Sequence, residues 1–354
     1  MGFFPERSDV MNYGENTLRA LEFRAPAGIP TVIELPVATW LRYGEELEKI
    51  VLRHPRIFPG YRPGSRPTEP ADPFEKAYEA LRDDWGCIWR NTTPGILGQV
   101  VGHPLADWKS LSTFRPPDPV EQYNWREFRE RVAEGRRQRT LVQGWVSVTQ
   151  GGFIFDRLQF LRGMENLMID FATHPPQLPA LIEMLVEYNL KYVKLWLELG
   201  VDLMAFHGDI GTQHGLLFSP QTFRRYLKPA YTEIFAICRA AGVHVFYSSD
   251  GWMLDLVEDM IACGVTLHDP EVRTNTAEGI ARAYGGRLCA QVQLDTQMLP
   301  TCTPREIHEH VAEVVETVGA PAGGLIIYAY VGPDVPLENI EALCSACEEF
   351  CWRL

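Results

Sequence analysis

The sequence is short of positive charge, because 33 Lys and Arg residues face 46 Asp and Glu residues and give a net charge of −13 at pH 7. Proteins that bind a phosphate backbone or an anionic membrane present basic patches, so we expect neither nucleic acid nor a membrane as a partner. The one dense basic run, Arg136-Arg137-Gln138-Arg139, is too short to change this expectation, and we interpret it as a solvated segment before a strand.

Long apolar runs are also missing. No run approaches the ~18 residues needed to span a bilayer, and the N-terminus has no basic region followed by an apolar one. The eight cysteines are scattered, which is typical of reduced thiols, and we therefore expect a cytoplasmic protein. Cys344, Cys347 and Cys351 share one face of a predicted C-terminal helix. We interpret them as small apolar residues of its buried stripe rather than as three metal ligands.

Nucleotide-binding motifs are not found either: no Gly-x-Gly-x-x-Gly follows the first strand, and no Gly-x-x-x-x-Gly-Lys-Ser/Thr occurs. Short β-rich runs instead alternate with long amphipathic helices, which favours an α/β fold with a parallel sheet. The eight strand candidates are Thr31–Leu35, Gly86–Trp89, Thr140–Ser147, Val201–Phe206, Val243–Tyr247, Val265–His268, Arg287–Leu294 and Gly324–Tyr330. This predicts a single (β/α)8 TIM barrel with an N-terminal extension. Residues 1–354 would form one domain, with 1–80 as an N-terminal wrap and first strand and 81–354 as the remainder.

Three helices carry clear start and stop signals. One begins at Ser219-Pro220, a capping hydroxyl before a first-turn proline, and is predicted to end at Gly242. Another has apolar residues at steps of three and four from Leu178 to Leu199 and ends at Gly200. A third begins at Thr303 with the capping box Thr-Pro-Arg-Glu and ends near Gly319.

In such barrels the residues just past each strand face one shared pocket, so the strand candidates also predict a site. Ionisable groups follow or end several strands, and polar groups there are costly unless they are paired or used. The predicted catalytic residues are Glu34, His207, Asp209, Asp250 and His268. The predicted substrate-binding residues are Trp89, Trp145, Tyr247, Gln293, Tyr328 and Tyr330.

Two chemistries fit these residue types. His207, Asp250 and His268 offer imidazole and carboxylate ligands for a divalent metal such as zinc, with Asp209 orienting one of them. The alternative is acid–base work, in which clustered carboxylates raise one another's pKa and a histidine supplies a proton near neutral pH.

The region between the predicted fourth and fifth strands carries a family resemblance. The motifs Gly208-Asp209-Ile210-Gly211-Thr212-Gln213, Ser219-Pro220, Lys228-Pro229 and Ser249-Asp250-Gly251 resemble the uroporphyrinogen decarboxylase superfamily. Leu294-Asp295-Thr296-Gln297 and Val335-Pro336-Leu337-Glu338-Asn339-Ile340 are similar again. The resemblance covers roughly residues 140–350. It implies a barrel enzyme with one of two activities.

The first activity is decarboxylation of uroporphyrinogen, which needs no cofactor and uses an N-terminal Arg-Gln-Ala-Gly-Arg stretch to bind substrate carboxylates. This chain reads Pro36-Val37-Ala38-Thr39-Trp40-Leu41-Arg42-Tyr43 after its first strand and has no such stretch. A polycarboxylate substrate would need several pocket cations. Decarboxylation of a tetrapyrrole or another carboxylated substrate is therefore the second hypothesis.

The other branch contains methyltransferases that use a corrinoid carrier protein. Its coenzyme M members hold zinc with His-x-Cys-Gly after the fifth strand and a Cys after the eighth, whereas this chain has Ser248-Ser249-Asp250-Gly251 and Ala329-Tyr330. The remaining carboxylate and histidine groups suit polarisation of oxygen or nitrogen. The leading hypothesis is a corrinoid-linked methyltransferase for a small O- or N-methylated compound. A non-catalytic corrinoid- or porphyrin-binding barrel is the third hypothesis. The sequence leaves open whether the protein forms a homodimer.

Overall fold

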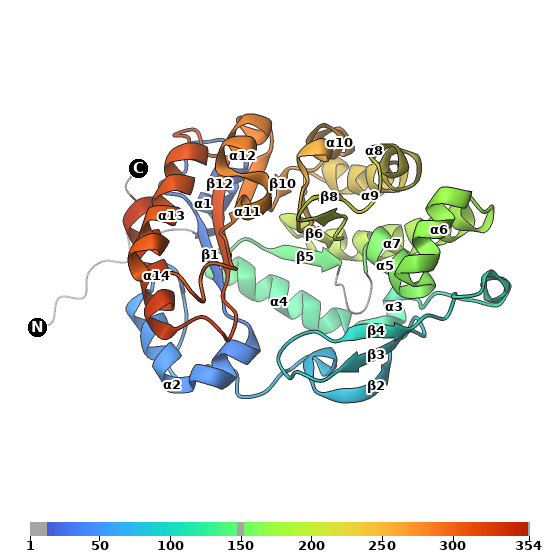
Figure 1. The fold of residues 1–354 in the computed structure, drawn as a ribbon, viewed down its shortest axis with the longest axis horizontal. Helices are drawn as coiled ribbons and strands as arrows, with labels where there is room; N and C mark the ends of the chain where they lie inside the picture. Colours follow the sequence, from blue (N-terminus) through green and yellow to red (C-terminus); the bar gives the residue numbers. More distant parts are fainter. Residues whose placement is uncertain (1–12, 147–151, 353–354) are drawn as a thin grey trace, which may run out of the picture.

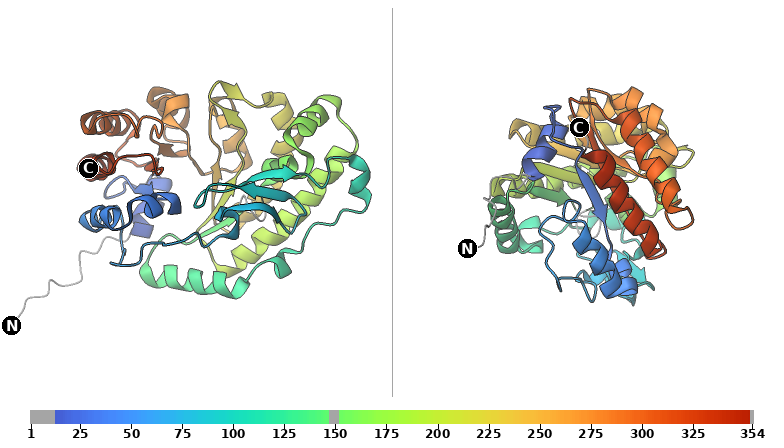
Figure 2. Two further views of the ribbon diagram at one scale, coloured as in Figure 1. Left: turned by 60° about the horizontal axis from the view of Figure 1, so that its bottom comes forward. Right: turned by 90° about the vertical axis from the view of Figure 1, so that its left-hand side faces the viewer.

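The protein is described by a computed structural model that covers residues 13–146 and 152–352. Its centre is a curled parallel sheet of seven strands in the order β1-β12-β11-β10-β9-β6-β5 (Figure 1). These strands are β1 Thr31–Glu34, β5 Gln143–Val146, β6 Leu203–His207, β9 His244–Ser248, β10 Leu267–His268, β11 Cys289–Gln293 and β12 Leu325–Tyr330. The longer helices lie around the outside of this sheet (Figure 2).

Helices, short turns and two small sheets make up the other elements. The helices are α1 Tyr13–Leu21, α2 Val37–Arg53, α3 Pro119–Gln122, α4 Trp125–Gln138, α5 Ile154–Arg162, α6 Met164–Thr173, α7 Gln177–Leu199, α8 Pro220–Thr222, α9 Lys228–Ala240, α10 Val257–Cys263, α11 Val272–Asn275, α12 Ala277–Tyr284, α13 Pro304–Val318 and α14 Leu337–Cys351. The short 3₁₀ and π segments are η2 Pro73–Glu75, η3 Trp108–Ser112, η4 Phe223–Leu227 and η5 Leu254–Leu256. Two small antiparallel sheets comprise β2 Tyr78–Arg82, β3 Ile88–Asn91 and β4 Gln99–Gly102, and β7 Gly211–Thr212 and β8 Gly215–Leu216.

The prediction that Gly86–Trp89 forms the second strand of the barrel is wrong. The chain there forms β3, which pairs antiparallel with β2 and β4 outside the central sheet. Parallel neighbours need a crossover of a dozen or more residues, and the short connections between β2, β3 and β4 favour antiparallel pairing instead. A closed eight-stranded barrel is therefore not confirmed: within the described residues β1 and β5 are the edge strands of a seven-stranded, barrel-like sheet.

Alternation along the strands separates the inside of the curled sheet from its outside. Leu203, Ala205, Phe246, Leu267, Cys289 and Ile326 point inward and pack against Ala20 and Leu21 of α1. Side chains one residue away, such as Met204, Val245 and Val292, belong to the larger core between sheet and helices. A one-residue step thus moves a side chain from one face to the other. This alternation decides which strand-end residues reach the site.

The predicted helix signals are confirmed. Thr303 and Glu306 form the reciprocal capping box of α13, which ends at Val318. α7 ends at Leu199, and Gly200 follows with φ of 80°, a left-handed conformation that glycine adopts without a steric penalty. Ser219 caps α8, and the helical path then runs through the π-turn η4 into α9, which ends at Ala240.

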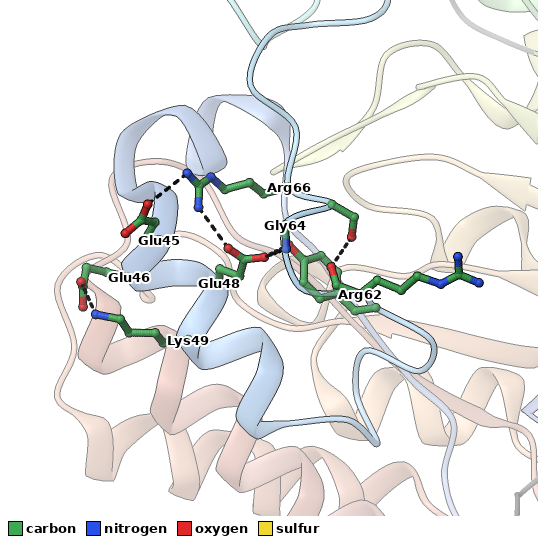
Figure 3. A network of polar contacts seen from close by, with 9 residues as sticks. Glu45, Glu46, Glu48, Lys49, Arg62, Gly64 and Arg66 are labelled. Carbon is green, nitrogen blue, oxygen red and sulfur yellow. Dashed lines mark hydrogen bonds and ion pairs between the residues drawn. The ribbon is translucent and has the colours of Figure 1, made fainter.

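The loop at residues 56–67 is held on α2 by one carboxylate. Glu48 accepts hydrogen bonds from the Gly64 N–H, from the Tyr61 hydroxyl at 3.1 Å and from the Arg66 guanidinium at 3.0 Å (Figure 3). These contacts, with the Gly64 N–H first, lower the pKa of Glu48. Trp40 of α2 also stacks on Tyr61 at 5.7 Å between ring centroids. These contacts hold the loop against α2.

A buried ion pair joins the β2-β3-β4 sheet to α5. The fully buried Arg157 contacts the Asp83 carboxylate at 3.2 Å, and Asp83 also accepts the Trp89 indole N–H at 3.0 Å. At the other end of the chain, Cys344, Cys347 and Cys351 are fully buried, which confirms the core interpretation of that stripe. No helix in the part of the chain that the structure describes is long and apolar enough to cross a membrane.

Candidate active site

A cavity of about 1140 Å³ lies at the carboxyl ends of the parallel strands. Its lining comes from six strands of the central sheet, from the loops that follow strands, from α5 and from the first residue of α6. Seven of the residues predicted from sequence line it: Glu34, His207, Asp209, Asp250, Gln293, Tyr328 and Tyr330. The structure thus brings together groups that lie almost 300 positions apart, while their chemical roles stay predictions.

The loops after β6 and β9 cross at the cavity and place two carboxyls side by side. A Cβ on Gly211 would lie 2.4 Å from the Asp250 carbonyl oxygen, and one on Gly251 would lie 2.5 Å from the Gly211 carbonyl carbon. Gly251 also has φ of 81°, so glycine is required there for both reasons. The crossing lets the Asp250 N–H donate to Asp209 Oδ1 at 3.1 Å. The glycines of the two motifs therefore serve to bring Asp209 and Asp250 together.

Asp269 lies directly after β10, lines the cavity and is close enough to Asp250 for their charges to interact. Its carboxyl accepts the Ser248 hydroxyl at 2.6 Å and the Ser249 N–H at 3.1 Å, and the residue is 6% exposed. Burial raises the pKa of Asp269 well above its usual value, and the neighbouring Asp250 and Asp209 act in the same direction. The two hydrogen bonds oppose that rise and hold the β9 and β10 ends together.

Glu271 approaches Asp250 from the β10–α11 loop. Its carboxylate accepts the Gly251 N–H at 2.8 Å and the Thr274 hydroxyl at 3.2 Å. Asn275, which is 1% exposed, fixes the same turn by donating to the Gly251 carbonyl at 2.9 Å and accepting the Met253 N–H at 3.0 Å. The turn that carries Asp250 is thus held from several sides.

The pKa of Asp250 is raised from 3.8 to about 7. Desolvation by the surrounding protein is the largest cause, followed by the charges of Asp209 and Glu271. Asp156, on the buried face of α5, also lines the cavity, and its pKa is raised well above the usual value by burial and then by Asp209. Like charges that are partly removed from water disfavour one another's ionised forms. At neutral pH the cavity therefore holds a mixture of protonated and ionised carboxyls.

Strands β1 and β12 contribute a tyrosine–carboxylate pair to the cavity lining. The Tyr328 hydroxyl donates to Glu34 Oε2 at 2.6 Å, and burial followed by the Glu34 charge raises the pKa of Tyr328. His207 also faces the cavity. Burial lowers the pKa of His207 while Asp209 and Glu34 act against the shift, so its imidazole is neutral near pH 7. Its ring nitrogens make no hydrogen bond to another residue within 13–146 and 152–352.

Two predicted site residues, Tyr247 and His268, point away from the cavity. Phe246 and Ser248 of β9 face it, so Tyr247 between them faces the helices, where its hydroxyl donates to the Gly208 carbonyl at 2.7 Å. His268 is fully buried beside Tyr284 of α12, at 3.0 Å from Nδ1 to the hydroxyl, and burial lowers the pKa of His268 to about 3. The prediction misplaced both by one residue, and on a strand a shift of one residue moves the side chain to the other face of the sheet.

The two predicted tryptophans also lie off the main cavity. Trp145 packs against Phe128 and Trp196, with ring centroids 5.6 and 4.9 Å away. Trp89 is 1% exposed in the small antiparallel sheet, where it borders a neighbouring cavity of about 420 Å³. That second cavity shares Gln159, Phe160 and Met164 with the first. Trp89 was misplaced because β3 is not a strand of the central sheet.

The predicted metal site does not fit this arrangement. With His268 turned outward, His207 and Asp250 lose the third member of their set. Among the described residues, no three His, Cys, Asp or Glu side chains are grouped so that they could hold a metal ion. The carboxyls instead receive neutral donors, namely backbone N–H groups and hydroxyls. We derive no catalytic step through a metal.

Three acidic lining residues were missed: Asp156, Asp269 and Glu271. Asp269 adjoins the chosen His268, and strand alternation relative to Leu267 would have identified it. The sequence signal for Asp156 was weaker: it is a carboxyl that directly follows the apolar and aromatic segment Phe153-Ile154-Phe155. Glu271 lies just before α11 and pairs in parallel with Gln293 of β11, so it continues the alternation from Leu267 and Asp269 beyond the end of β10.

Comparison with known proteins places this geometry in context. The sequence model described as Uroporphyrinogen decarboxylase (URO-D) matches residues 152–350, more than half of the chain. Two curated relatives named "Uroporphyrinogen decarboxylase", from two strains of Thermus thermophilus, are 29% and 28% identical over 172 residues. Each match covers 48% of this chain and 48% of the relative, so the chain spans about half the length of the curated relatives it matches.

A solved structure, named "methyltransferase from Methanosarcina mazei", is similar over nearly the whole chain. The match covers 96% of this chain and 98% of that protein, with a TM-score of 0.68 and 18% sequence identity. At that identity the likeness shows a shared fold. The barrel-like arrangement, including the segments around the cavity, is therefore one that is already known among solved proteins.

Proposed function

The chain belongs to the uroporphyrinogen decarboxylase (URO-D) family, and we propose that within it the protein is a methyltransferase. It would move a methyl group from a small O- or N-methylated compound to a corrinoid held by a carrier protein. The observation that carries the proposal is the Asp250 cluster: a carboxyl with a pKa of about 7 beside Asp209 and Glu271, in a cavity of about 1140 Å³. Such a group would act on the heteroatom that loses the methyl group.

The cavity fits this use in size and lining. Small-molecule sites typically enclose about 300–1,000 Å³, so 1140 Å³ leaves room beside a small substrate for the face of a larger partner group. Tyr330, Phe160, Met164 and Leu217 add aromatic and apolar surface, which suits the flat face of a corrinoid. When bound, the corrinoid supplies a nucleophile that accepts the methyl group; every other task falls to this chain.

The chain's own residues would stabilise the leaving heteroatom. An oxygen that loses its methyl group develops negative charge, and protonated Asp250 can donate a proton to it at neutral pH. Asp209 and Glu271 hold the Asp250 backbone and the Gly251 N–H, so the acid keeps its position. A nitrogen that already carries a positive charge leaves as a neutral amine, and then the ionised carboxyls act as its counter-charge.

Decarboxylation of a uroporphyrinogen is the second candidate, because two curated relatives carry that name. Its substrate bears many carboxylates and would need pocket cations. None of the described residues that line the cavity is Lys or Arg, while six of them are Asp or Glu. Electrostatics therefore favours methyl transfer. Incubation with uroporphyrinogen III followed by chromatography for coproporphyrinogen tests this candidate, and product formation would support it.

The proposal is tested by transfer of an isotopically labelled methyl group from a set of methyl ethers, N-methyl amines and quaternary ammonium compounds to a purified corrinoid carrier in its reduced state. We expect transfer from at least one class and a loss of about 10²-fold or more in Asp250→Asn, the size typical for a positioned acid or counter-charge. Asp255→Asn, a nearby exposed carboxyl outside the cavity lining, is the matched control and should keep the activity. No transfer from any donor would refute the proposal; tight corrinoid binding without turnover would favour a non-catalytic binding barrel.

A further inference from the structure

We propose that the cavity selects a positively charged organic group, so that the methyl donor is an N-methylated ammonium compound rather than a neutral methyl ether. The proposal rests on the methyltransferase function proposed above, because only that function makes the bound compound a methyl donor. The selectivity for an organic cation stands on the cavity itself and can be tested by binding alone.

The described lining of the cavity supplies no cationic side chain to balance its carboxyls. Glu34, Asp156, Asp209, Asp250, Asp269 and Glu271 all line the cavity, and among its described lining residues there is no Lys or Arg. Hydroxyls and backbone N–H groups orient Glu34, Asp209, Asp269 and Glu271 without neutralising them. Arg157 lies near enough to Asp156 to favour its ionised form, but it forms its ion pair with Asp83, which lies outside this lining.

Buried carboxylates elsewhere in the chain form ion pairs with Arg or Lys. Asp83 is paired with Arg157, Asp170 with Arg162, and Asp259 with both Arg224 and Lys228. Burying an ionised carboxyl is costly unless a cation compensates it. A group of carboxyls that face a cavity without such partners is therefore a local exception. A ligand that brings its own positive charge removes the cost.

The other walls of the cavity suit a diffuse cation. Tyr328, Tyr330, Phe160 and Phe246 line the same cavity and offer aromatic faces, which attract alkylammonium groups. The imidazole of His207 faces the cavity with no hydrogen-bond partner in the described chain, and its neutral form adds an acceptor for an ammonium N–H. A compact divalent ion would instead need three or more converging ligands, and the described residues contain no such group.

The proposed transfer balances in charge and atoms. The methyl carbon–nitrogen bond breaks, and its electron pair stays on nitrogen, which leaves as a neutral amine. The methyl group passes as a formal cation to a nucleophilic reduced corrinoid on a carrier protein, whose electron pair forms the new bond. No proton has to be supplied to the leaving nitrogen, so ionised carboxyls suffice on the enzyme side.

Cation binding should also displace protons from the cluster. Asp250 titrates near neutral pH, and the pKa values of Asp156 and Asp269 are also raised, so part of the cluster is protonated before the ligand arrives. A cation favours the ionised forms, and the protons go to the buffer. The binding enthalpy at pH 7 should therefore depend on the ionisation enthalpy of the buffer, with the sign that proton release requires.

The test is isothermal titration calorimetry on the full chain at pH 7 in phosphate and in Tris. The probes are choline and its uncharged isostere 3,3-dimethyl-1-butanol, with MgCl₂ and ZnCl₂ as competitors. We expect choline to bind at least about ten-fold more tightly than the alcohol and to release protons. Asp250→Asn should weaken choline about ten-fold, the effect of roughly 1.4 kcal/mol, whereas Asp255→Asn should not.

Equal affinity for choline and the alcohol would overturn the proposal, as would unchanged choline binding in Asp250→Asn. Displacement of choline by either metal ion at stoichiometric concentration would overturn it in favour of a metal site. The labelled-methyl assay separates this proposal from the one on which it rests. Selective choline binding without methyl transfer defeats the methyltransferase function alone, whereas transfer from ethers but not from ammonium compounds defeats the substrate class alone.

Discussion

Replacing Asp209 by Asn should make Asp250 a stronger acid. Asp209 contributes a negative charge next to Asp250 and is the second cause, after desolvation by the surrounding protein, of its raised pKa. Asn keeps an oxygen in the place of the Oδ1 atom that accepts the Asp250 N–H. The substitution therefore removes the charge while it preserves the hydrogen bond that positions the loop.

The expected size follows from simple electrostatics. Two unit charges on the order of 4–8 Å apart at an effective dielectric constant of about 20 interact by roughly 2–4 kcal/mol, and one pKa unit corresponds to about 1.4 kcal/mol. Water in the cavity screens the pair, and burial and Glu271 remain in the variant. We expect the pKa of Asp250 to fall from about 7 by about one pH unit, well short of its ordinary value of 3.8.

Carboxyl ¹³C NMR titration of protein labelled at aspartate, with Asp250→Asn to assign the resonance, measures the midpoint directly. The sign for stability can be checked in parallel. The folded pKa of Asp250 lies above its unfolded value, so its contribution is present in full below about pH 4 and is lost as pH rises through about 7. In Asp209→Asn the loss should begin at the same pH, which the unfolded state sets, and should be complete at a lower pH because the folded pKa is lower.

A wild-type midpoint below about pH 5 would refute the reasoning, because the surroundings of Asp250 would then not disfavour its charge. An unchanged or higher midpoint in Asp209→Asn would refute the part assigned to Asp209. Asp202→Asn offers a control, since that carboxylate is paired with Arg136 and lies outside the cavity lining. It should leave the Asp250 titration where it is.

Other substitutions test the framework around the site. Asp83→Ala removes the carboxylate that Arg157 contacts and should cost about 3–5 kcal/mol in urea unfolding. Gly251→Ala should lower stability by at least roughly 1–3 kcal/mol in thermal unfolding, because φ there is 81° and a Cβ would lie 2.5 Å from the Gly211 carbonyl carbon. Glu48→Gln should make the loop at residues 56–67 more sensitive to proteolysis than in the wild type at pH 7. Near pH 3 the two proteins should be cleaved alike, because the lowered pKa of Glu48 confines its stabilising effect to higher pH. His268→Asn should leave methyl transfer unchanged, and a large loss would restore that residue to the site.

Much of the fold was predictable because its signals are local. The capping box at Thr303, the apolar stripe that ends before Gly200 and the capping hydroxyl of Ser219 each specify a helix end through a few neighbouring residues. Seven of the strand candidates coincide with strands of the central sheet for the same reason. The segment around Trp89 misled because its composition suits any strand, while its pairing depends on the short connections to β2 and β4.

The site was predictable only in outline. The rule that strand ends face one pocket identifies the right loops, but the choice within each loop depends on strand alternation and therefore on the position of the last buried residue. Taking His268 instead of Asp269, and Tyr247 instead of Ser248, is the same one-residue error at two neighbouring strands. In both cases we chose a residue type that is common in active sites over the neighbouring residue whose side chain faces the cavity.

The distribution of charge could not be predicted at all. A net charge of −13 argues against a nucleic acid or an anionic membrane as a partner, yet it says nothing about which carboxyls have cationic partners. Asp83 and Asp259 find theirs 74 and 31–35 positions away, through contacts that only the folded chain creates, whereas Asp250 meets Asp209 and Glu271 instead. Because those other buried carboxylates are paired, the unneutralised cluster is best explained by what enters the cavity. The evidence for function is therefore the difference between the cavity carboxyls, which have no cationic partner in the lining, and the paired carboxylates elsewhere, and only the folded structure shows this difference.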